Sequence, residues 1–415
     1  MSQLLFRNGR LLVPYEAQLR DGFEVLVEGP SIRDVSDKPI HAPGATVIDL
    51  GGRTMMPGLI DCHVHVTASR LNLAANSELP NALAAYRAIP ILQGMLMRGF
   101  TTVRDTGGAD LFLAQAVQEG LVAGPRIVPS GKALSQTGGH GDFRGRGDEA
   151  APCACGSRIG AMARVADGVD AVRQAVRDEL RKGAGQIKIM ASGGVASPTD
   201  RIDGTQYSLD EMKAIVGEAQ AQNTYVLAHA YTALAIRRAI DSGVRTIEHG
   251  NLIDDETAVR MHELGAYAVP TLITYEALAT QGASLGLPAA SVAKIDDVRL
   301  EGLRSLERFR NAGVKMGFGS DLLGELHRFQ SREFLLRTEV LSPAEVIASA
   351  TAVGAEILRM DGRLGVIAPD ASADLLVVDG DPLKDIALLT GQGEHLDLIM
   401  KAGDLVKNEL TPSMS

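Results

Sequence analysis

The sequence predicts a (β/α)8 barrel, an α/β fold also called a TIM barrel, with a small β-sandwich domain that both chain ends form together. Three observations predict it: eight short apolar runs recur between residues 58 and 321, amphipathic helical segments follow most of them, and both chain ends carry a different pattern of short strands and turns. No GxGxxG or Walker sequence supports the alternative of an open doubly wound sheet. We expect a first β part over 1–56, a barrel over 57–361 and a second β part over 362–415.

The β-domain is predicted from the two ends of the chain. Asn8-Gly9 and Glu28-Gly29-Pro30 are typical of tight turns between short strands. The strands themselves are expected over residues 4–13, 23–35, 45–52, 373–381 and 395–408. Because the two ends share this pattern, we expect one domain that is split in sequence by the barrel.

The barrel strands are expected at the eight apolar runs, over residues 58–66, 100–108, 126–134, 186–194, 225–232, 245–251, 267–274 and 314–321. Acidic residues near the start and glycine near the end mark the clearest helices, over residues 167–183, 208–222, 233–243 and 254–265. Eight units of strand and helix favour a closed barrel.

The composition indicates a protein that acts on small molecules. The net charge is −10 with both signs interspersed, which argues against nucleic acid or an anionic membrane as the main partner. We find no signal sequence and no run of the ~20 apolar residues that a membrane span needs, so we expect a cytoplasmic location. Three cysteines provide neither a disulfide framework nor a structural zinc site, and we expect reduced thiols at Cys62, Cys153 and Cys155.

Ionisable side chains lie near the carboxyl ends of five of the eight runs. The loops at that end of a (β/α)8 barrel build the catalytic site, so we expect these residues to meet: His63, His65, Lys188, His229, His249 and Asp321. Side chains alternate along a strand, so His63 and His65 point the same way, as do His229 and Tyr231. Imidazoles and a carboxylate are suitable ligands for zinc or a similar divalent ion, which also explains histidines in a buried strand.

Lys188 differs from the other members of this set, because two divalent cations would repel an ammonium group. It fits if carbon dioxide carboxylates the amine, because the product is an anion with two oxygens that can bridge two metals. We therefore expect N6-carboxylation of Lys188. A capping or salt-bridging lysine is the alternative, and the apolar strand QIKIM disfavours it.

This set of residues, in this order and on these strands, resembles the amidohydrolase superfamily with a binuclear metal centre. The resemblance covers essentially the whole chain, with one departure at Pro369-Asp370, where relatives usually have Pro-Gly in a turn. Four segments are similar to the imidazolonepropionase-related group and, more narrowly, to its prolidase-like metallo-carboxypeptidases: SQTGGHGD (135–142), KIMASGGVASPTD (188–200), LAHAYT (227–232) and TIEHGNLID (246–254).

The resemblance implies hydrolysis of the amide bond to a C-terminal amino acid, in dipeptides of the Xaa-Pro type and in N-acyl amino acids, with ochratoxin A among the candidate substrates. It implies that His63, His65 and Asp321 hold the more buried of two divalent ions, expected to be Zn²⁺. His229 and His249 would hold the more exposed ion, and carboxylated Lys188 would bridge the two. Because close relatives form ring-like assemblies, often octamers, the resemblance also implies a homo-oligomer.

Roles in catalysis follow from the residue types. We expect Asp321 to act as the general base and then to protonate the leaving nitrogen. His140, in a glycine-rich loop after the third run, is expected to polarise the scissile carbonyl and bind substrate, and Tyr231 to bind the substrate carbonyl or carboxylate. A solvated loop histidine and a packing tyrosine are the alternatives. Candidates for paired hydrogen bonds to a substrate carboxylate are Arg144, Arg146 and Arg158.

Other activities remain open from the sequence. An Xaa-Arg or Xaa-Lys carboxypeptidase would differ only in a pocket built from loops. A deaminase or cyclic-amide hydrolase such as imidazolonepropionase shares the frame, although members with one metal lack the lysine on the fourth strand. Organophosphate hydrolysis is expected as a side activity of the same metal pair. A binding protein that has lost catalysis should lack ligands, whereas all six positions are filled here.

Overall fold

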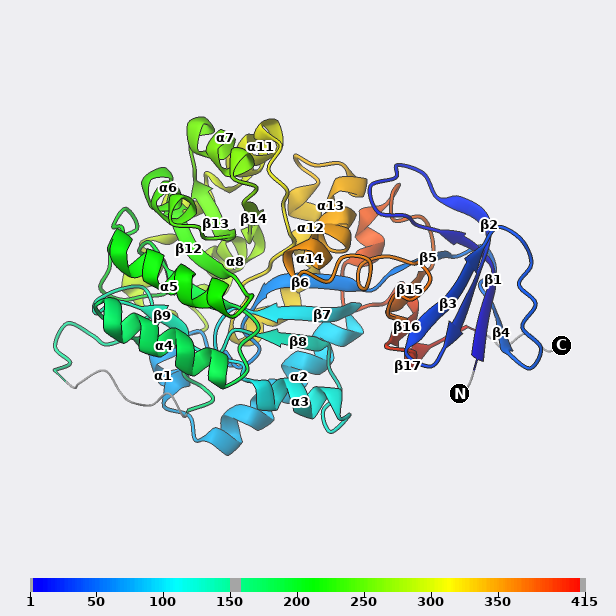
Figure 1. Cartoon of the computed structure of the whole chain (residues 1–415), viewed down its shortest axis with the longest axis horizontal. Helices are drawn as coiled ribbons and strands as arrows, with labels where there is room; N and C mark the ends of the chain where they lie inside the picture. Colours follow the sequence, from blue (N-terminus) through cyan, green and yellow to red (C-terminus); the bar gives the residue numbers. More distant parts are fainter. Residues whose placement is uncertain (1–2, 150–157, 411–415) are drawn as a thin grey trace.

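The computed structural model describes residues 3–149 and 158–410, which form a barrel and an adjoining β-sheet unit. In Figure 1, blue strands from the start of the chain lie beside red strands from its end. The sheet has the order β17-β16-β15-β5-β1-β2-β3, with β4 paired to β1. Its strands are β1 (Gln3–Leu11), β2 (Arg20–Glu28), β3 (Ser31–Ser36), β4 (Thr46–Asp49), β5 (Thr54–Pro57), β15 (Leu375–Val378), β16 (Leu396–Lys401) and β17 (Asp404–Asn408).

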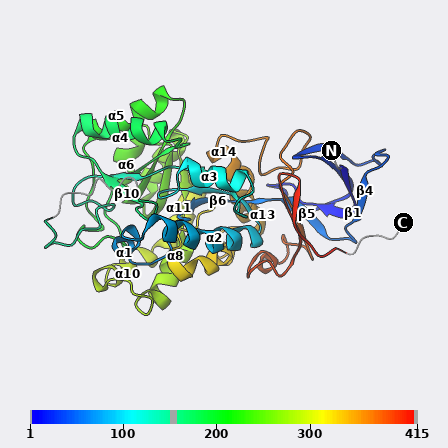
Figure 2. The same cartoon turned by 90° about the horizontal axis from the view of Figure 1, so that it is seen from below.

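Strand β5 joins the two ends of the chain in this sheet. It runs parallel to β1 and antiparallel to β15, where Met56 pairs with Leu376. The sheet curls, as Figure 2 shows, and side chains from distant strands such as Val27 and Met400 share one apolar cluster. Both chain ends therefore build one β unit, as expected. The boundaries at residues 56 and 362 stay a prediction.

The turn predicted at Asn8-Gly9 is wrong. Strand β1 continues through both residues, and its register with β2 shifts between Phe6 and Gly9. Asn8 adopts a φ of 57°, so the extra residue forms a β-bulge in a continuous strand. The turn at Glu28-Gly29-Pro30 is confirmed, because it connects β2 to β3.

The barrel strands run parallel to one another, in the orders β6-β7-β8 and β10-β9-β11-β12-β13-β14. Six of the eight predicted runs each hold one strand at the expected place, namely β6, β7, β11, β12, β13 and β14. The barrel strands within the described residues are β6 (Leu59–Val64), β7 (Phe100–Asp105), β8 (Arg126–Pro129), β9 (Ala133–Ser135), β10 (Ala163–Val165), β11 (Ile187–Met190), β12 (Val226–Thr232), β13 (Thr246–Leu252) and β14 (Tyr267–Val269).

The third predicted run, 126–134, is two strands rather than one. Strand β8 pairs with β7, whereas β9 pairs with β11. Between them Gly131 adopts a φ of 68° and donates its N–H to the carbonyl of Ala109, 3.1 Å away. This left-handed residue interrupts the strand, so the single-strand prediction was wrong here.

The eighth predicted run, 314–321, lies where expected but is not a regular strand. One bridge pairs Met316 with Ala268 of β14, and Phe318 accepts a hydrogen bond from Cys62 of β6 at 2.7 Å. The segment therefore closes the barrel between β14 and β6. At Gly319 a Cβ atom would lie 2.6 Å from Val269 and 3.0 Å from the His63 side chain, so the chain passes too close to its neighbours for ordinary strand residues.

Helices surround the barrel strands (Figures 1 and 2). The four helices predicted from sequence are confirmed as α4 to α7, and Ser208 and Glu211 form a capping box at the start of α5. No helix within 3–149 and 158–410 is long and apolar enough to cross a membrane. The helices are α1 (Leu73–Ser77), α2 (Asn81–Met97), α3 (Leu111–Gln118), α4 (Val169–Arg181), α5 (Leu209–Ala221), α6 (Ala233–Asp241), α7 (Asp255–Glu263), α8 (Leu272–Ala277), α9 (Ala289–Val292), α10 (Ile295–Arg299), α11 (Gly302–Ala312), α12 (Glu333–Arg337), α13 (Pro343–Ser349) and α14 (Ala352–Ile357).

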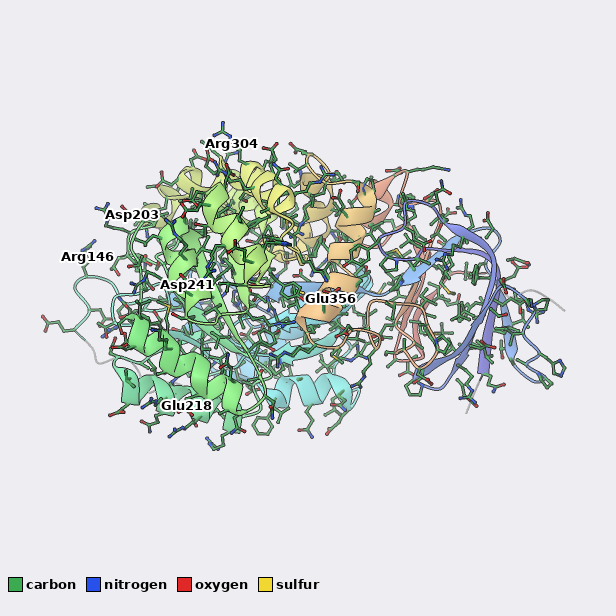
Figure 3. All side chains as sticks on the ribbon, turned by 45° about the horizontal axis from the view of Figure 1, so that its top comes forward. Arg146, Asp203, Glu218, Asp241, Arg304 and Glu356 are labelled. Carbon is green, nitrogen blue, oxygen red and sulfur yellow. The ribbon has the colours of Figure 1, made fainter. Side chains whose placement is uncertain are left out.

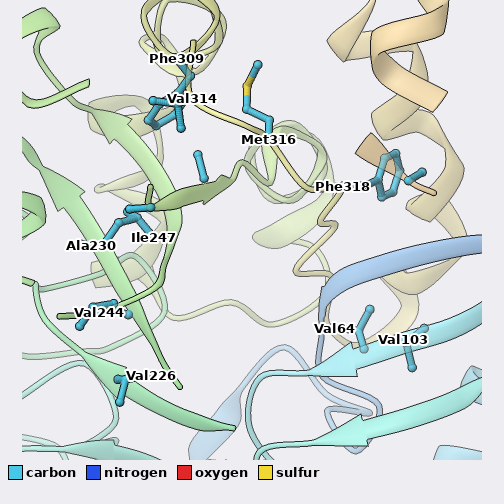
Figure 4. Close-up of a cluster of buried hydrophobic side chains, with 14 of the residues drawn as sticks. Val64, Val103, Val226, Ala230, Val244, Ile247, Phe309, Val314, Met316 and Phe318 are labelled. Atoms are coloured by element: carbon cyan, nitrogen blue, oxygen red, sulfur yellow. The ribbon is translucent and has the colours of Figure 1, made fainter. Parts of the chain in front are cut away.

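The main apolar core includes side chains from both the barrel strands and the helices. Figure 4 shows Val64 of β6, Val103 of β7 and Ile247 of β13 in the same cluster as Phe309 of α11. All four are essentially inaccessible to solvent. This packing holds the strands in the arrangement that brings their carboxyl ends together.

A buried ion pair fixes the segment that closes the barrel. Arg337 of α12 is fully buried and donates to Glu333 at 2.8 Å. Its other nitrogens donate to the carbonyls of Pro270 at 2.6 Å and Gly317 at 3.0 Å, and its guanidinium lies over the Phe318 ring. Arg337 therefore joins the end of β14 to the eighth run.

Replacing Arg337 by methionine should destabilise the fold, because Glu333 would then be a buried carboxylate without its cation. Breaking a buried pair costs about 3–5 kcal/mol. Chemical and thermal denaturation of the purified variant would measure the loss. The control is Arg177→Met, which removes an exposed pair with Glu218, labelled on the surface in Figure 3, and should cost at most about 1 kcal/mol. Equal losses in the two variants would contradict the role given to Arg337.

Candidate metal and substrate site

One cavity gathers the predicted metal ligands, the predicted base and two of the predicted substrate contacts, His140 and Tyr231. It opens at the carboxyl ends of the barrel strands, where a barrel builds its catalytic site. Its lining includes His63, His65, His140, Lys188, His229, Tyr231, His249 and Asp321. The side chains come from β6, β11, β12, β13, the eighth run and the loop after β9.

Asp321 lies at the centre of this group. Its Oδ1 is 3.4 Å from Nε2 of His63 and 3.2 Å from Nε2 of His65. His63, His249 and Asp321 each offer a ligand atom, and these atoms lie within 4.8 Å of one another. Burial opposes ionisation of Asp321, but the neighbouring His63 and His65 rings hold the pKa of the carboxyl well below its usual range. The cluster thus combines an anion with imidazoles, the ligand types that zinc takes.

Glu248 and Arg104, which do not line the cavity, orient the His63 ring. Glu248 Oε2 accepts from Nδ1 of His63 at 2.6 Å, and Arg104 donates to both oxygens of Glu248 at 2.8 and 3.0 Å. Burial raises the pKa of Glu248, but the Arg104 charge and the hydrogen bond with His63 together with neighbouring charges lower it to about 2. The carboxylate therefore accepts the Nδ1 hydrogen and leaves Nε2 of His63 as a bare ligand atom.

The other histidines are held in a similar way. Nδ1 of His65 donates to the carbonyl of Gly107 at 2.9 Å, and Nε2 of His229 donates to the carbonyl of Gly193 at 3.0 Å. Nδ1 of His249 lies 2.7 Å from Oγ1 of Thr271. Burial lowers the pKa of His229 and of His249 well below the usual value, which keeps both rings neutral. A neutral imidazole with one nitrogen engaged and the other bare is the form that binds a metal ion.

Lys188 is a buried amine in the same group. Its side chain is 1% exposed, and burial lowers its pKa to about 8. Among the residues that the structure describes, none makes a hydrogen bond or ion pair with its nitrogen. The amine belongs to the lining of the cavity, and the charges of Glu248 and Asp321 act on it. Together with the bare imidazole nitrogens and Asp321, it marks a site whose donors fit divalent metal ions.

Two of the clustered residues have strained backbones. His249 has a φ of 72° and Asp321 a φ of 51°, values that non-glycine residues rarely adopt. Buried Asp61 helps to hold this geometry: it accepts from the backbone N–H of His63 at 3.0 Å and from the hydroxyl of Ser320 at 2.6 Å. Gln330 also donates to Asp61, at 2.9 Å. Sequence reasoning missed Asp61 and Glu248, although both are acidic residues inside predicted barrel strands.

The substrate contacts predicted from sequence lie beside the metal ligands. The His140 ring stacks on His229 with centroids 4.2 Å apart, and Tyr231 packs edge-on against His229 at 4.7 Å. The hydroxyl of Tyr275 in α8 donates its hydrogen to the hydroxyl oxygen of Tyr231, 3.0 Å away. The hydroxyl hydrogen of Tyr231 is therefore free for another acceptor. Sequence reasoning missed Tyr275, because it follows a run that was assigned to a strand up to Thr274.

The three candidate arginines do not line the cavity. Arg144 pairs with Asp142, exposed Arg146 donates to the carbonyl of Thr199, and Arg158 donates to that of Ser77. Figure 3 shows Arg146 pointing outward at the edge of the molecule. Of the cysteines, Cys62 is a buried free thiol, and Cys153 and Cys155 lie outside the described residues.

The remaining wall of the cavity is largely apolar. Among the described lining residues, Asp321 is the single carboxylate and Lys188 the single lysine, and no arginine occurs. Apolar lining is supplied by Leu73, Phe143, Met162, Val195, Leu278 and Leu323. The arrangement suits a ligand with one polar group at the metal ligands and an apolar remainder.

Comparisons with known proteins agree with this geometry. A model of the Amidohydrolase family matches residues 54–406. A solved amidohydrolase is 61% identical with a TM-score of 0.98, covering 99% of this chain and 100% of that one. A prolidase solved with N-methylphosphonate-L-proline is 59% identical with a TM-score of 0.97, covering 98% and 100%. Ochratoxinase of Aspergillus niger is 32% identical over 379 residues, covering 85% of this chain and 75% of the relative. The chain therefore belongs to the amidohydrolase family and is a metal-dependent amidohydrolase.

Proposed function

We propose that this enzyme is a binuclear metallo-carboxypeptidase that hydrolyses the amide bond to an apolar C-terminal amino acid, in Xaa-Pro dipeptides and in N-acyl amino acids. The observation that carries the proposal is the cavity, in which six metal-competent residues adjoin walls without a second carboxylate among the described residues. The similarity to a prolidase and to ochratoxinase supports the same substrate class. Ochratoxin A, an amide of phenylalanine, belongs to that class.

The ligand assignment is the one that the resemblance to the amidohydrolase superfamily implies. We assign His63, His65 and Asp321 to one metal ion, His229 and His249 to the other, and carboxylated Lys188 to the bridge between them. Because burial lowers the pKa of Lys188 to about 8, the amine is deprotonated often enough near neutral pH to take up carbon dioxide. When bound, the two cations lower the proton affinity of the attacking water and polarise the scissile carbonyl.

The chain's own residues then supply the proton transfers and hold the substrate. Asp321 shares Oδ1 with His63 and His65, which leaves Oδ2 to accept the proton of the attacking water and to pass it to the leaving nitrogen. His140 lines the substrate pocket beside the metal ligands, stacked on His229. Tyr231 donates its hydroxyl hydrogen to the substrate carboxylate, since the hydrogen of Tyr275 already occupies the Tyr231 oxygen. Water is excluded by the apolar wall.

The apolar wall argues against a basic leaving residue. A guanidinium or ammonium group needs a buried counter-charge, and Asp321, the single carboxylate of the described lining, is already engaged by His63 and His65. Lys188 argues against a cyclic-amide hydrolase with one metal. Organophosphate hydrolysis by the same centre fits as a side activity.

A substrate panel tests the proposed specificity. With zinc-loaded enzyme, Xaa-Pro dipeptides, N-acyl phenylalanine and ochratoxin A should be cleaved. Xaa-Arg should have a kcat/KM roughly 150- to 5,000-fold lower, because an unpaired buried charge costs about 3–5 kcal/mol. Release of free amino acid, measured by chromatography, gives the rates. Cleavage of a cyclic amide but of none of these substrates would overturn the carboxypeptidase assignment.

Removal of Lys188 tests the bridge. Lys188→Ala should lower the metal content below two ions per chain, measured by atomic emission, and should abolish hydrolysis. The control is Lys315→Ala, which removes a half-exposed lysine that pairs with Glu356, and it should keep both metals and full activity. Full activity with two metals retained in Lys188→Ala would exclude the bridging role.

A further inference from the structure

A hydrogen-bonded chain of side chains lies behind His140, on the side away from the cavity. Nδ1 of His140 is 2.7 Å from Oγ of Ser197, and Ser197 donates its hydroxyl hydrogen to Oδ1 of Asp200 in a short hydrogen bond. Nδ1 of His140 also lies 3.7 Å from Oδ2 of Asp200. Ser197 is fully buried, and the Asp200 side chain is 5% exposed.

The donor and acceptor roles in this chain follow from counting hydrogens. An ionised carboxylate only accepts, and a serine hydroxyl has a single hydrogen to donate. Because Ser197 donates that hydrogen to Asp200, its oxygen must accept from His140. Nδ1 of His140 therefore carries a hydrogen, and Nε2 is the ring nitrogen left for the cavity that His140 lines.

Three loops are tied together around this chain. His140 follows β9, Ser197 and Asp200 follow β11, and Lys294 lies just before α10. Nζ of Lys294 donates to the carbonyls of Gly194 and Ser197 and to Oδ1 of Asp200, at 3.0, 2.9 and 3.1 Å. The Asp200 charge is thus balanced by Lys294 and does not depend on His140 for its cation.

Two further contacts fix the His140 loop in place. Gln206 accepts from the backbone N–H of His140 at 2.9 Å and donates to Asp200 at 3.1 Å. The imidazole also lies so close to Gly194 that a Cβ atom there would collide with the ring. The ring is therefore held between Gly194 and the His229 ring, on which it stacks.

We propose that Ser197 and Asp200 are positioning residues for the hydrolysis: they accept the Nδ1 hydrogen of His140 and so fix the ring with Nε2 toward the substrate. The kinetic part of this inference rests on the proposed function, whereas the ring orientation does not. Partners of this kind, which orient a functional histidine without touching substrate, change activity by about 10–100-fold when removed.

Ser197→Ala tests the proposal with little other change, because Asp200 keeps its bonds from Lys294, Gln206 and the Gly194 N–H. Metal content and melting temperature should match the wild type, kcat should fall about 10–100-fold and KM should change less than about threefold. Ser197→Thr, which keeps a hydroxyl, should recover most of the activity. The control Ser305→Ala removes a buried serine of α11 that bonds the Gly302 carbonyl, and it should keep full activity.

A double-mutant cycle separates positioning from a general effect on the loop. In a His140→Ala background, Ser197→Ala should cause no further loss of kcat/KM, because the residue it positions is absent. An equal loss in both backgrounds, or unchanged activity in Ser197→Ala alone, would overturn the proposal. Asp200→Asn is a second variant: its amide can reverse the hydrogen bonds, so a similar loss of kcat is expected.

Crystal structures of the wild type and Ser197→Ala distinguish failure of this inference from failure of the proposed function. The wild-type ring should keep Nδ1 within hydrogen-bond distance of Ser197, and the variant ring should leave its place over Gly194. An unmoved ring in the variant would overturn the positioning role whatever the substrate. If instead the ring moves but no peptide or N-acyl amino acid is cleaved by the wild type, the proposed function fails and the positioning role stands.

Discussion

The free energy needed to bury several ionisable side chains in one barrel is the constraint on which the rest of the structure depends. Histidines, a lysine and a carboxylate meet in a cavity where most of them are buried from solvent, and each needs a partner. The protein supplies these partners from one side: Glu248 and Arg104 for His63, carbonyl groups for His65 and His229, and Thr271 for His249. The ring nitrogens and carboxylate oxygens that have no such partner face the cavity. Together these atoms form the metal site.

The same constraint explains where the backbone departs from ideal geometry. His249 and Asp321 adopt left-handed conformations, and the eighth run replaces a regular strand by a glycine-rich segment between β14 and β6. Asp61 and Arg337 hold that segment from two directions, Asp61 through Ser320 and Arg337 through the Gly317 carbonyl. Strain at the ligands is thus balanced by buried polar contacts immediately outside the cavity.

Much of this could be predicted from sequence, because strand alternation is a strict rule. The spacing of His63 and His65 required both to point inward, and His229 and Tyr231 do so from β12 for the same reason. The errors lie where tertiary contacts override local pattern. Gly131 splits the third run, Gly319 passes too close to Val269 for a regular strand, and Asn8 forms a bulge rather than a turn. Ser197 and Asp200 were missed because a loop positions them, and loop geometry has no period to detect. Tyr275 was missed because its segment was assigned to a strand, whereas it belongs to α8.

The proposed binuclear centre draws six residues from β6, β11, β12, β13 and the eighth run, with a modified lysine as the bridge. A crystal structure of the zinc-loaded enzyme, with anomalous diffraction recorded at the zinc edge, tests it most directly. We expect two zinc peaks in the cavity, one ligated by His63, His65 and Asp321 and the other by His229 and His249, with a carboxylated Lys188 between them. A single zinc peak, or an unmodified Lys188 amine that contacts neither ion, would contradict it.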